Sequence, residues 1–286
     1  MKLSILDLSP AAKGTSDENA LQQTIDLAIE ADQLGYERFW LSEHHQLKHI
    51  ASASPALMIA AIGQATKQIR LGAGAVLLPL HPPYLVAETH RQLAAMFPDR
   101  IDLGIGRAPG APPEVTTRLA GNFLEAVRRH PERLDELLTH LADDNIRPVP
   151  SKLPEVWLLG TGRRSAIAAR ERGLSYCFGA FMSASPASEA FQHYKQSLSD
   201  ARLRAKTMIA VSVACVSPSA PNRDLALMPH DQEHPPPIVG LPAEVATQLK
   251  SVSRESGADE LMIHIPSASF ETRHSTIQHL ADELFA

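Results

Sequence analysis

Three short apolar segments of the chain carry the residues that we place in a candidate site. The first leads into Glu43, His44 and His45, the second contains Gly74 next to an alanine, and the third ends in Arg107. Carboxylates and imidazoles can transfer protons near neutral pH, and arginine can bind a phosphate through its planar fork of donors. Such residues at the ends of apolar strands are typical of a site at the C-terminal ends of parallel strands. We therefore expect the three ends to converge.

The adjacent histidines allow two interpretations. On an extended chain, neighbouring side chains point to opposite sides, so we expect His44 or His45 to face the site while the other packs against a loop. Together with Glu43 they could also bind zinc or iron, since imidazole and carboxylate groups suit both metals. No further set of ligands follows the later apolar segments. A metal site stays open as an alternative.

Two stretches favour a phosphorylated ligand. Arg107 follows a Gly-x-Gly sequence, and Thr161, Gly162, Arg163 and Ser165 stand between a predicted strand and a predicted helix. Backbone N–H groups at a helix start, a hydroxyl and arginine side chains together can hold a phosphate. A dinucleotide-binding loop does not fit the first stretch, because three prolines follow where that loop would open a helix.

The elements that would position these residues alternate regularly. Predicted strands cover residues 1–8, 37–41, 69–78, 101–106, 156–160, 174–181, 208–216 and 260–265. Apolar residues at helical spacing follow each of them, and Pro131 should break the helical region at residues 115–142. This alternation favours an α/β fold with parallel strands, and at this length a single (β/α)8 TIM barrel domain over residues 1–286. Residues 217–237, rich in proline, should form a loop after the seventh strand.

Composition excludes several classes of protein. A net charge of −5 and a pI near 6.2 give no reason to expect binding to nucleic acid or to an anionic membrane surface. Cys177 and Cys215 both stand in apolar strands, which predicts buried thiols in a reducing cytoplasm. No apolar run reaches the roughly 20 residues that span a bilayer, and the N-terminus lacks the centre of a signal peptide. We expect a cytoplasmic protein.

Long segments of the sequence also match a known family, in the same order along the chain. They cover residues 40–45, 66–79 and 97–110, with shorter matches at residues 157–160 and 238–242. On these segments the chain resembles the bacterial luciferase-like family of flavin-dependent oxidoreductases. Most of the match lies in the first 110 residues, and a weaker similarity runs nearly to the C-terminus. The resemblance implies a (β/α)8 barrel with FMN across its mouth.

The resemblance also implies roles for particular residues. The arginine that matches Arg107 and the loop that matches residues 161–165 hold the ribityl phosphate in the family. The histidine that matches His44 lies near the flavin and assists the reaction, and we expect Glu43 to line the same cofactor site. A non-prolyl cis peptide that matches Gly74 and Ala75 often lies against the flavin ring.

The implied activity is a two-component monooxygenase reaction. A separate flavin reductase supplies reduced FMN, which reacts with O2 and oxidises a small organic substrate. Members commonly form homodimers through barrel helices, and the stripe of Met58, Ala61 and Ile62 could serve here or could be ordinary core. The loop at residues 217–237 is shorter than the lid that relatives commonly carry. This shortening puts monooxygenase activity in doubt more than flavin binding.

Three other functions are consistent with the residues. The chain could be a flavin-binding carrier or interaction protein with little turnover, or a dehydrogenase that uses a deazaflavin. It could also be a metal-dependent hydrolase that uses Glu43, His44 and His45. An absorbance spectrum and a metal analysis of the purified protein would separate the flavin and metal hypotheses. Neither the substrate nor the identity of the reductase can be read from a motif.

Overall fold

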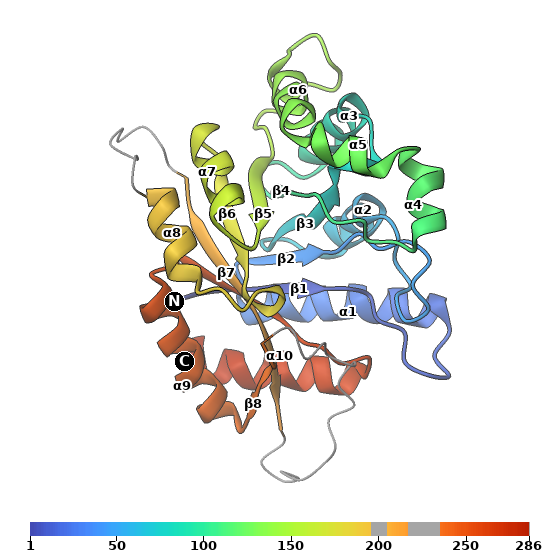
Figure 1. The fold of residues 1–286 in the computed structure, drawn as a ribbon. Coiled ribbons are helices and arrows are strands. Elements are labelled where there is room, and N and C mark those ends of the chain that lie inside the picture. Colours follow the sequence, from blue (N-terminus) through green and yellow to red (C-terminus); the bar gives the residue numbers. More distant parts are fainter. Residues whose placement is uncertain (196–204, 217–234, 286) are drawn as a thin grey trace.

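A computed structural model of the chain describes residues 1–195, 205–216 and 235–285. Parallel strands form a closed barrel at its centre, and helices pack around the outside (Figure 1). Around the ring, the strands are β1 Lys2–Asp7, β2 Arg38–Leu41, β3 Arg70–Leu77, β4 Ile101–Gly106, β5 Glu155–Gly160, β6 Ser175–Gly179, β7 Thr207–Cys215 and β9 Glu260–His264. Pairing of β9 with β1 closes the ring. The predicted (β/α)8 barrel is confirmed.

Helices follow the strands as the apolar spacing predicts. They are α1 Asp17–Leu34, α2 Pro55–Ala65, α3 Pro83–Met96, α4 Pro113–Ala120, α5 Phe123–Arg128, α6 His130–Ala142, α7 Arg163–Glu171, α8 Ala187–Lys195, α9 Pro242–Ser256 and α10 Phe270–Phe285, with the short 3-10 helices η1 Leu78–Leu80 and η2 Ala180–Met182. One strand was not predicted. β8 Ile238–Gly240 pairs with the last residues of β7, beyond the part of β7 that belongs to the ring. Of the predicted loop, residues 217–234 lie outside the described residues.

The predicted helical region at residues 115–142 is three helices. Pro131 stands in the first turn of α6, where its missing N–H has no helical partner to lose, so the predicted break is confirmed. An additional break at Gly121 was missed. Its backbone has a φ of 65°, and this left-handed conformation, which favours glycine, ends α4.

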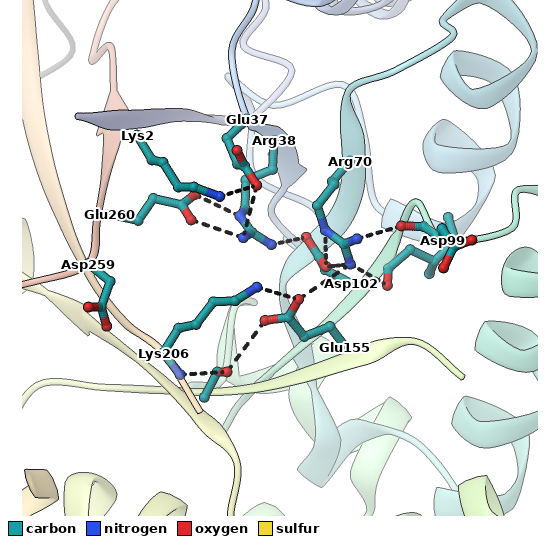
Figure 2. A network of polar contacts seen from close by, with 12 residues as sticks. Lys2, Glu37, Arg38, Arg70, Asp99, Asp102, Glu155, Lys206, Asp259 and Glu260 are labelled. Carbon is teal, nitrogen blue, oxygen red and sulfur yellow. Dashed lines mark hydrogen bonds and ion pairs between the residues drawn. The ribbon is translucent and has the colours of Figure 1, made fainter. Parts of the chain in front are cut away.

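The N-terminal end of the barrel is filled by a buried ionic network (Figure 2). Arg38 is fully buried and donates to Asp102 at 2.7 Å and to Glu260 at 2.7 and 2.9 Å. Arg70 donates to the other oxygen of Asp102, and the Ser4 hydroxyl donates to Glu260. Burial by itself would lower the pKa of Arg38, but the two carboxylates hold it above its ordinary value. Charges buried here are therefore paired, as burial of ions requires.

An apolar layer separates this network from the opposite end of the barrel. The layer consists of inward-facing side chains from six strands, namely Leu6, Trp40, Trp157, Cys177, Met208, Ala210 and Met262. The rings of Trp40 and Trp157 meet edge to face at 5.6 Å. Trp40 also donates its indole N–H to Asp102 at 2.9 Å, which fixes the layer to the network beneath it. Cys177 and Cys215 are both buried free thiols, as expected.

Close strand packing at Gly104 predicts a large effect of a single methyl group. A Cβ at this position would lie 2.3 Å from the carbonyl oxygen of Ala73 on β3, a backbone atom that cannot turn aside. We expect Gly104→Ala to reduce the free energy of unfolding by about 1–3 kcal/mol, the usual range for overpacking. Urea denaturation would measure it. In the matched control Gly162→Ala, the new Cβ meets no atom within 4 Å. Equal stability of the two variants would contradict the prediction.

The apolar stripe considered for a dimer interface belongs mainly to the core. Met58 and Ile62 are buried in the cluster between the barrel and its helices, so only Ala61 of the three is exposed. Met58 and Ile62 therefore support the other interpretation, ordinary core, because side chains that fill the core cannot also face a second chain. A homodimer formed by another surface stays a prediction. None of the described helices has the length and apolar character needed to cross a membrane.

Candidate cofactor and substrate site

A cavity of about 650 Å³ opens at the C-terminal ends of the barrel strands. Its lining includes every residue that the sequence assigned to the flavin site, namely Glu43, His44, Gly74, Ala75, Arg107, Thr161, Gly162, Arg163 and Ser165. The convergence expected from the strand ends is confirmed. Parallel strands in a closed barrel all end on the same side, which brings residues more than 100 positions apart to one mouth. The functions of the individual residues stay predictions.

One end of the cavity is basic. Arg107 follows β4, while Arg163 and Arg164 begin α7, and all three line the cavity with exposed side chains. Within the described part of the chain, no carboxylate forms an ion pair with any of them. The positive charge acts on a neighbouring histidine. Burial, and after it the charge of Arg107, lowers the pKa of His130 to about 4. Unpaired guanidinium groups are available for an anionic ligand.

The start of α7 adds backbone donors to this basic end. Gly162 is the residue before the helix, and no side chain of the described residues caps the first N–H groups. Ser165 does not fill that role, because its hydroxyl lies 2.8 Å from the Gly162 carbonyl oxygen and 3.0 Å from the Tyr176 hydroxyl. Ser165 therefore holds the turn, while the free N–H groups and the helix dipole favour an anion.

Glu43 joins three segments at the mouth. Its carboxylate accepts the backbone N–H of Leu77 at 2.8 Å, and lies 2.7 Å from His45 Nε2 and 2.6 Å from His81 Nε2. Burial would raise the pKa of Glu43, but the bonds from His81, Leu77 and His45 outweigh it and hold the pKa below its ordinary value. An ionised Glu43 thus ties the loop after β2 to the end of β3 and to η1. A contact of Glu43 with a cofactor stays a prediction.

These same contacts bear on the metal hypothesis. Among the described residues, the cluster whose ligand atoms lie close enough for one ion is Glu43, His45 and His81, and His44 is not part of it. The separations of 2.6 and 2.7 Å between the carboxylate and the two rings are those of charge-assisted hydrogen bonds. A metal ion would have to displace both bonds. The cluster fits a hydrogen-bonded tie between loops better than a metal centre.

His44 turns away from that cluster and lines the cavity. Its Nδ1 lies 3.0 Å from the Ser42 hydroxyl, which orients the ring. Burial lowers the pKa of His44, and although Glu43 acts in the opposite direction, the net shift is downward. The ring is therefore mostly neutral at neutral pH, the state in which it can accept a proton.

His45 instead supports the loop that carries Arg107. Its backbone N–H donates to the Gly110 carbonyl oxygen at 2.8 Å, and its ring is bonded to Glu43. Gly110 has a φ of 55°, and a Cβ there would lie 2.2 Å from Leu77. The expected division of the histidine pair, one toward the cavity and one supporting a loop, is confirmed.

Gly74 and Ala75 form a part of the wall with little side chain. The peptide bond between them is cis, as the resemblance implied, and it lies within β3. The register between β3 and β4 shifts at this point, between Ala73 and Val76. With Gly106 on β4 they line the cavity, and of these three residues only Ala75 has a side chain, a single methyl group.

Sequence reasoning missed the far wall of the cavity. Leu6, Leu8, Phe181, Met182 and His264 line it, and none was assigned a role. His264 is the last residue of β9, at a strand end like His44 and Arg107. The rule that found the other site residues could have found His264, had it been applied to the last strand.

Known proteins are similar to this chain in sequence or in fold. YwcH of Bacillus subtilis is 41% identical over 75% of this chain and 68% of its own length. A luciferase-like monooxygenase of Escherichia coli K12 is 30% identical over 91% of this chain and 90% of its own. The crystal structure of apo-MsnO8 matches with a TM-score of 0.90 and 30% identity, covering 99% and 98% of the two chains. The family model described as luciferase-like monooxygenase matches residues 1–260. The chain therefore belongs to the luciferase-like monooxygenase family.

Proposed function

We propose that the chain is an FMN-dependent monooxygenase that receives reduced flavin from a separate reductase and uses O2 to oxidise a small organic substrate. One observation carries this proposal. The unpaired basic end of the cavity, its wall of small residues at Gly74 and Ala75, and His44 all line one space of about 650 Å³. A flat ring with a phosphate tail and a site for proton transfer needs these three features together.

The described residues fit FMN by their chemistry. Arg107, Arg163 and the uncapped N-terminus of α7 would hold the phosphate. The surface formed by Gly74 and Ala75 leaves room for a ring, and His44 is placed to hold or move a proton at Nε2. Bound reduced FMN would supply the electrons for reaction with O2. The protein residues orient it and exclude water.

Names of similar proteins support this choice. A Bacillus subtilis protein, 38% identical over 64% of this chain and 58% of its own length, is an N-acetyl-S-alkylcysteine monooxygenase. The oxygenating constituent of 3,6-diketocamphane monooxygenase, 18% identical, has the same fold and was solved with FMN. An alcohol dehydrogenase of this fold, 14% identical, uses F420. A deazaflavin is thus the alternative cofactor that an experiment must test.

Binding and oxidation can be measured separately. The purified protein would be titrated with reduced FMN and with reduced F420 under nitrogen, then mixed with O2 in the presence of a panel of ketones and thioethers. We expect tighter binding of FMN than of F420, and an oxygenated product that requires the protein. Preference for F420 would favour a dehydrogenase. FMN binding without any product from the panel would favour the carrier function and overturn the monooxygenase proposal.

His44 should be needed for oxidation but not for holding FMN. We expect His44→Ala to lower the rate of product formation by about 10²- to 10⁴-fold, the usual contribution of a general acid or base. FMN affinity should change less than about twofold, since the phosphate is held elsewhere. Because burial lowers the pKa of His44, the acidic limb of the pH–rate profile should lie below pH 6.5. His193→Ala, on the outer helix α8, is the control. Unchanged turnover in His44→Ala would remove His44 from the mechanism.

A further inference from the structure

The two ends of the cavity differ in chemistry. In the ring of strands, β4 and β5 stand directly across from β9 and β1. The first two carry the basic end with Arg107 and Arg163. The second two carry Leu6, Leu8 and His264, joined by Phe181 from η2 beside β6. A phosphorylated cofactor that uses the basic end leaves this mainly apolar wall for a second molecule.

His264 is the polar exception in the apolar wall. The side chain is only 8% exposed, and its Nδ1 lies 3.1 Å from the hydroxyl of Ser212, the residue opposite it on β7. The Phe181 ring lies 5.4 Å from the imidazole, and these two contacts fix how the imidazole is oriented. Its Nε2 is buried and has no hydrogen-bond partner within the described part of the chain.

An unsatisfied buried nitrogen has a free-energy cost of about 1–3 kcal/mol, so a partner is expected. Here the nitrogen belongs to a residue that lines the cavity, which makes a bound molecule the natural source of that partner. Burial lowers the pKa of His264 to about 4, so the imidazole is neutral at neutral pH. Neighbouring Asp7 cannot provide a free charge, because Arg273 pairs with it at 2.6 Å.

We propose that the wall formed by Leu6, Leu8, Phe181 and His264 is the substrate subsite, and that it binds an uncharged, mainly apolar molecule whose one polar group hydrogen-bonds to His264 Nε2. This inference rests on the proposed function, because it assumes that a cofactor occupies the basic end. A charged group placed against this wall would lose its hydration without gaining an opposite charge. The wall therefore selects against carboxylates and amines.

Compounds with one ring and different polar groups test the charge preference directly. Cyclohexanol, cyclohexanecarboxylate and cyclohexylammonium would be titrated into the FMN-loaded protein labelled with ¹⁵N in its histidines. We expect cyclohexanol to bind at least about 10-fold more tightly than either ion, and to shift the His264 Nε2 resonance. Equal or tighter binding of an ion would overturn the proposal, as would an Nε2 resonance that does not move.

Variants test the role of the nitrogen itself. His264→Leu replaces the imidazole by an apolar side chain of similar size. It should weaken cyclohexanol binding about 5- to 10-fold, the value of one hydrogen bond. His264→Gln should restore part of the loss, and His193→Leu on α8 should have no effect. Unchanged cyclohexanol affinity in His264→Leu would mean that only water meets the nitrogen, and would overturn the proposal.

FMN titration of the same preparations separates the two hypotheses. If unmodified protein binds FMN but does not discriminate among the three compounds, the subsite inference fails while the proposed function stands. If the unmodified protein does not bind FMN, the proposed function fails first, and with it the division of the cavity on which the subsite depends.

Discussion

Replacing Arg107 by alanine is expected to weaken the binding of FMN by about 10- to 100-fold, as loss of a charge-assisted contact to phosphate would do. Riboflavin binding should change less than about twofold, since riboflavin lacks the phosphate. The expectation follows from the position of Arg107 at the basic end of the cavity, exposed and without an ion pair to any described carboxylate. Fluorescence titration of the two flavins would measure the effect.

The comparison of the two flavins is what makes this prediction specific. A variant that only disturbed the cavity would lose both ligands to the same extent. Equal losses for FMN and riboflavin would therefore contradict a phosphate role for Arg107. Because Arg107 makes no side-chain bond within the described part of the protein, its removal should leave the fold intact. Arg254→Ala, an exposed arginine on α9, is the matched control and should alter neither affinity.

The largest effect on stability is expected at Arg38. Its guanidinium is fully buried at the N-terminal end of the barrel, bonded to Asp102 and Glu260, and its Cζ lies 4.9 Å from the centre of the Trp157 ring. Arg38→Met would leave two buried carboxylates short of a counter-charge. We expect the free energy of unfolding to fall by about 3–5 kcal/mol, the usual result of breaking a buried ion pair by removing one partner. Guanidinium chloride denaturation would measure it.

A surface pair in the same network provides the matched control. Lys2 bonds to Glu37 at 2.9 Å, but the Lys2 side chain is 55% exposed, so water and salt screen the pair (Figure 2). Lys2→Met should lower the free energy of unfolding by less than about 1 kcal/mol. A loss at Arg38 as small as the loss at Lys2 would show that the buried network does not stabilise the barrel. FMN affinity of the folded Arg38 variant should be unchanged, because the apolar layer with Trp40 lies between the network and the cavity.

The proposed subsite and the proposed cofactor site explain why the cavity is divided. Phosphate recognition would need exposed, unpaired cations, and Arg107 after β4 with Arg163 and Arg164 at the start of α7 would provide them. An oxidation of an apolar molecule needs a wall that excludes water, which Leu6 and Phe181 provide on the other side. His44 lies in the loop after β2, a strand between these two parts of the ring, where a proton could be exchanged with either ligand.

The sequence alone predicted the barrel and the group of residues that meet at its mouth. Alternating strand and helix patterns leave few folds for a chain of this length, and in a closed parallel barrel every strand ends at the same mouth. Glu43, His44 and Arg107 could therefore be placed together without knowledge of any distance. The family resemblance of the segment around Gly74 and Ala75 also implied the cis peptide, which no local pattern of residue types would have predicted.

Only the tertiary structure decided which polar atoms find partners. Glu43 bonds to His81, 38 residues away, and His264 to Ser212, 52 residues away, so neither pairing leaves a signal in the local sequence. The same limit applies to Met58, whose apolar stripe suited a dimer interface and the core equally well until packing placed it in the core. Spacing along the chain determines which face of an element is apolar. What that face meets depends on the arrangement of all the elements. Here that arrangement left the Nε2 atom of His264 buried, in a residue that lines the cavity, with no hydrogen-bond partner among the described residues.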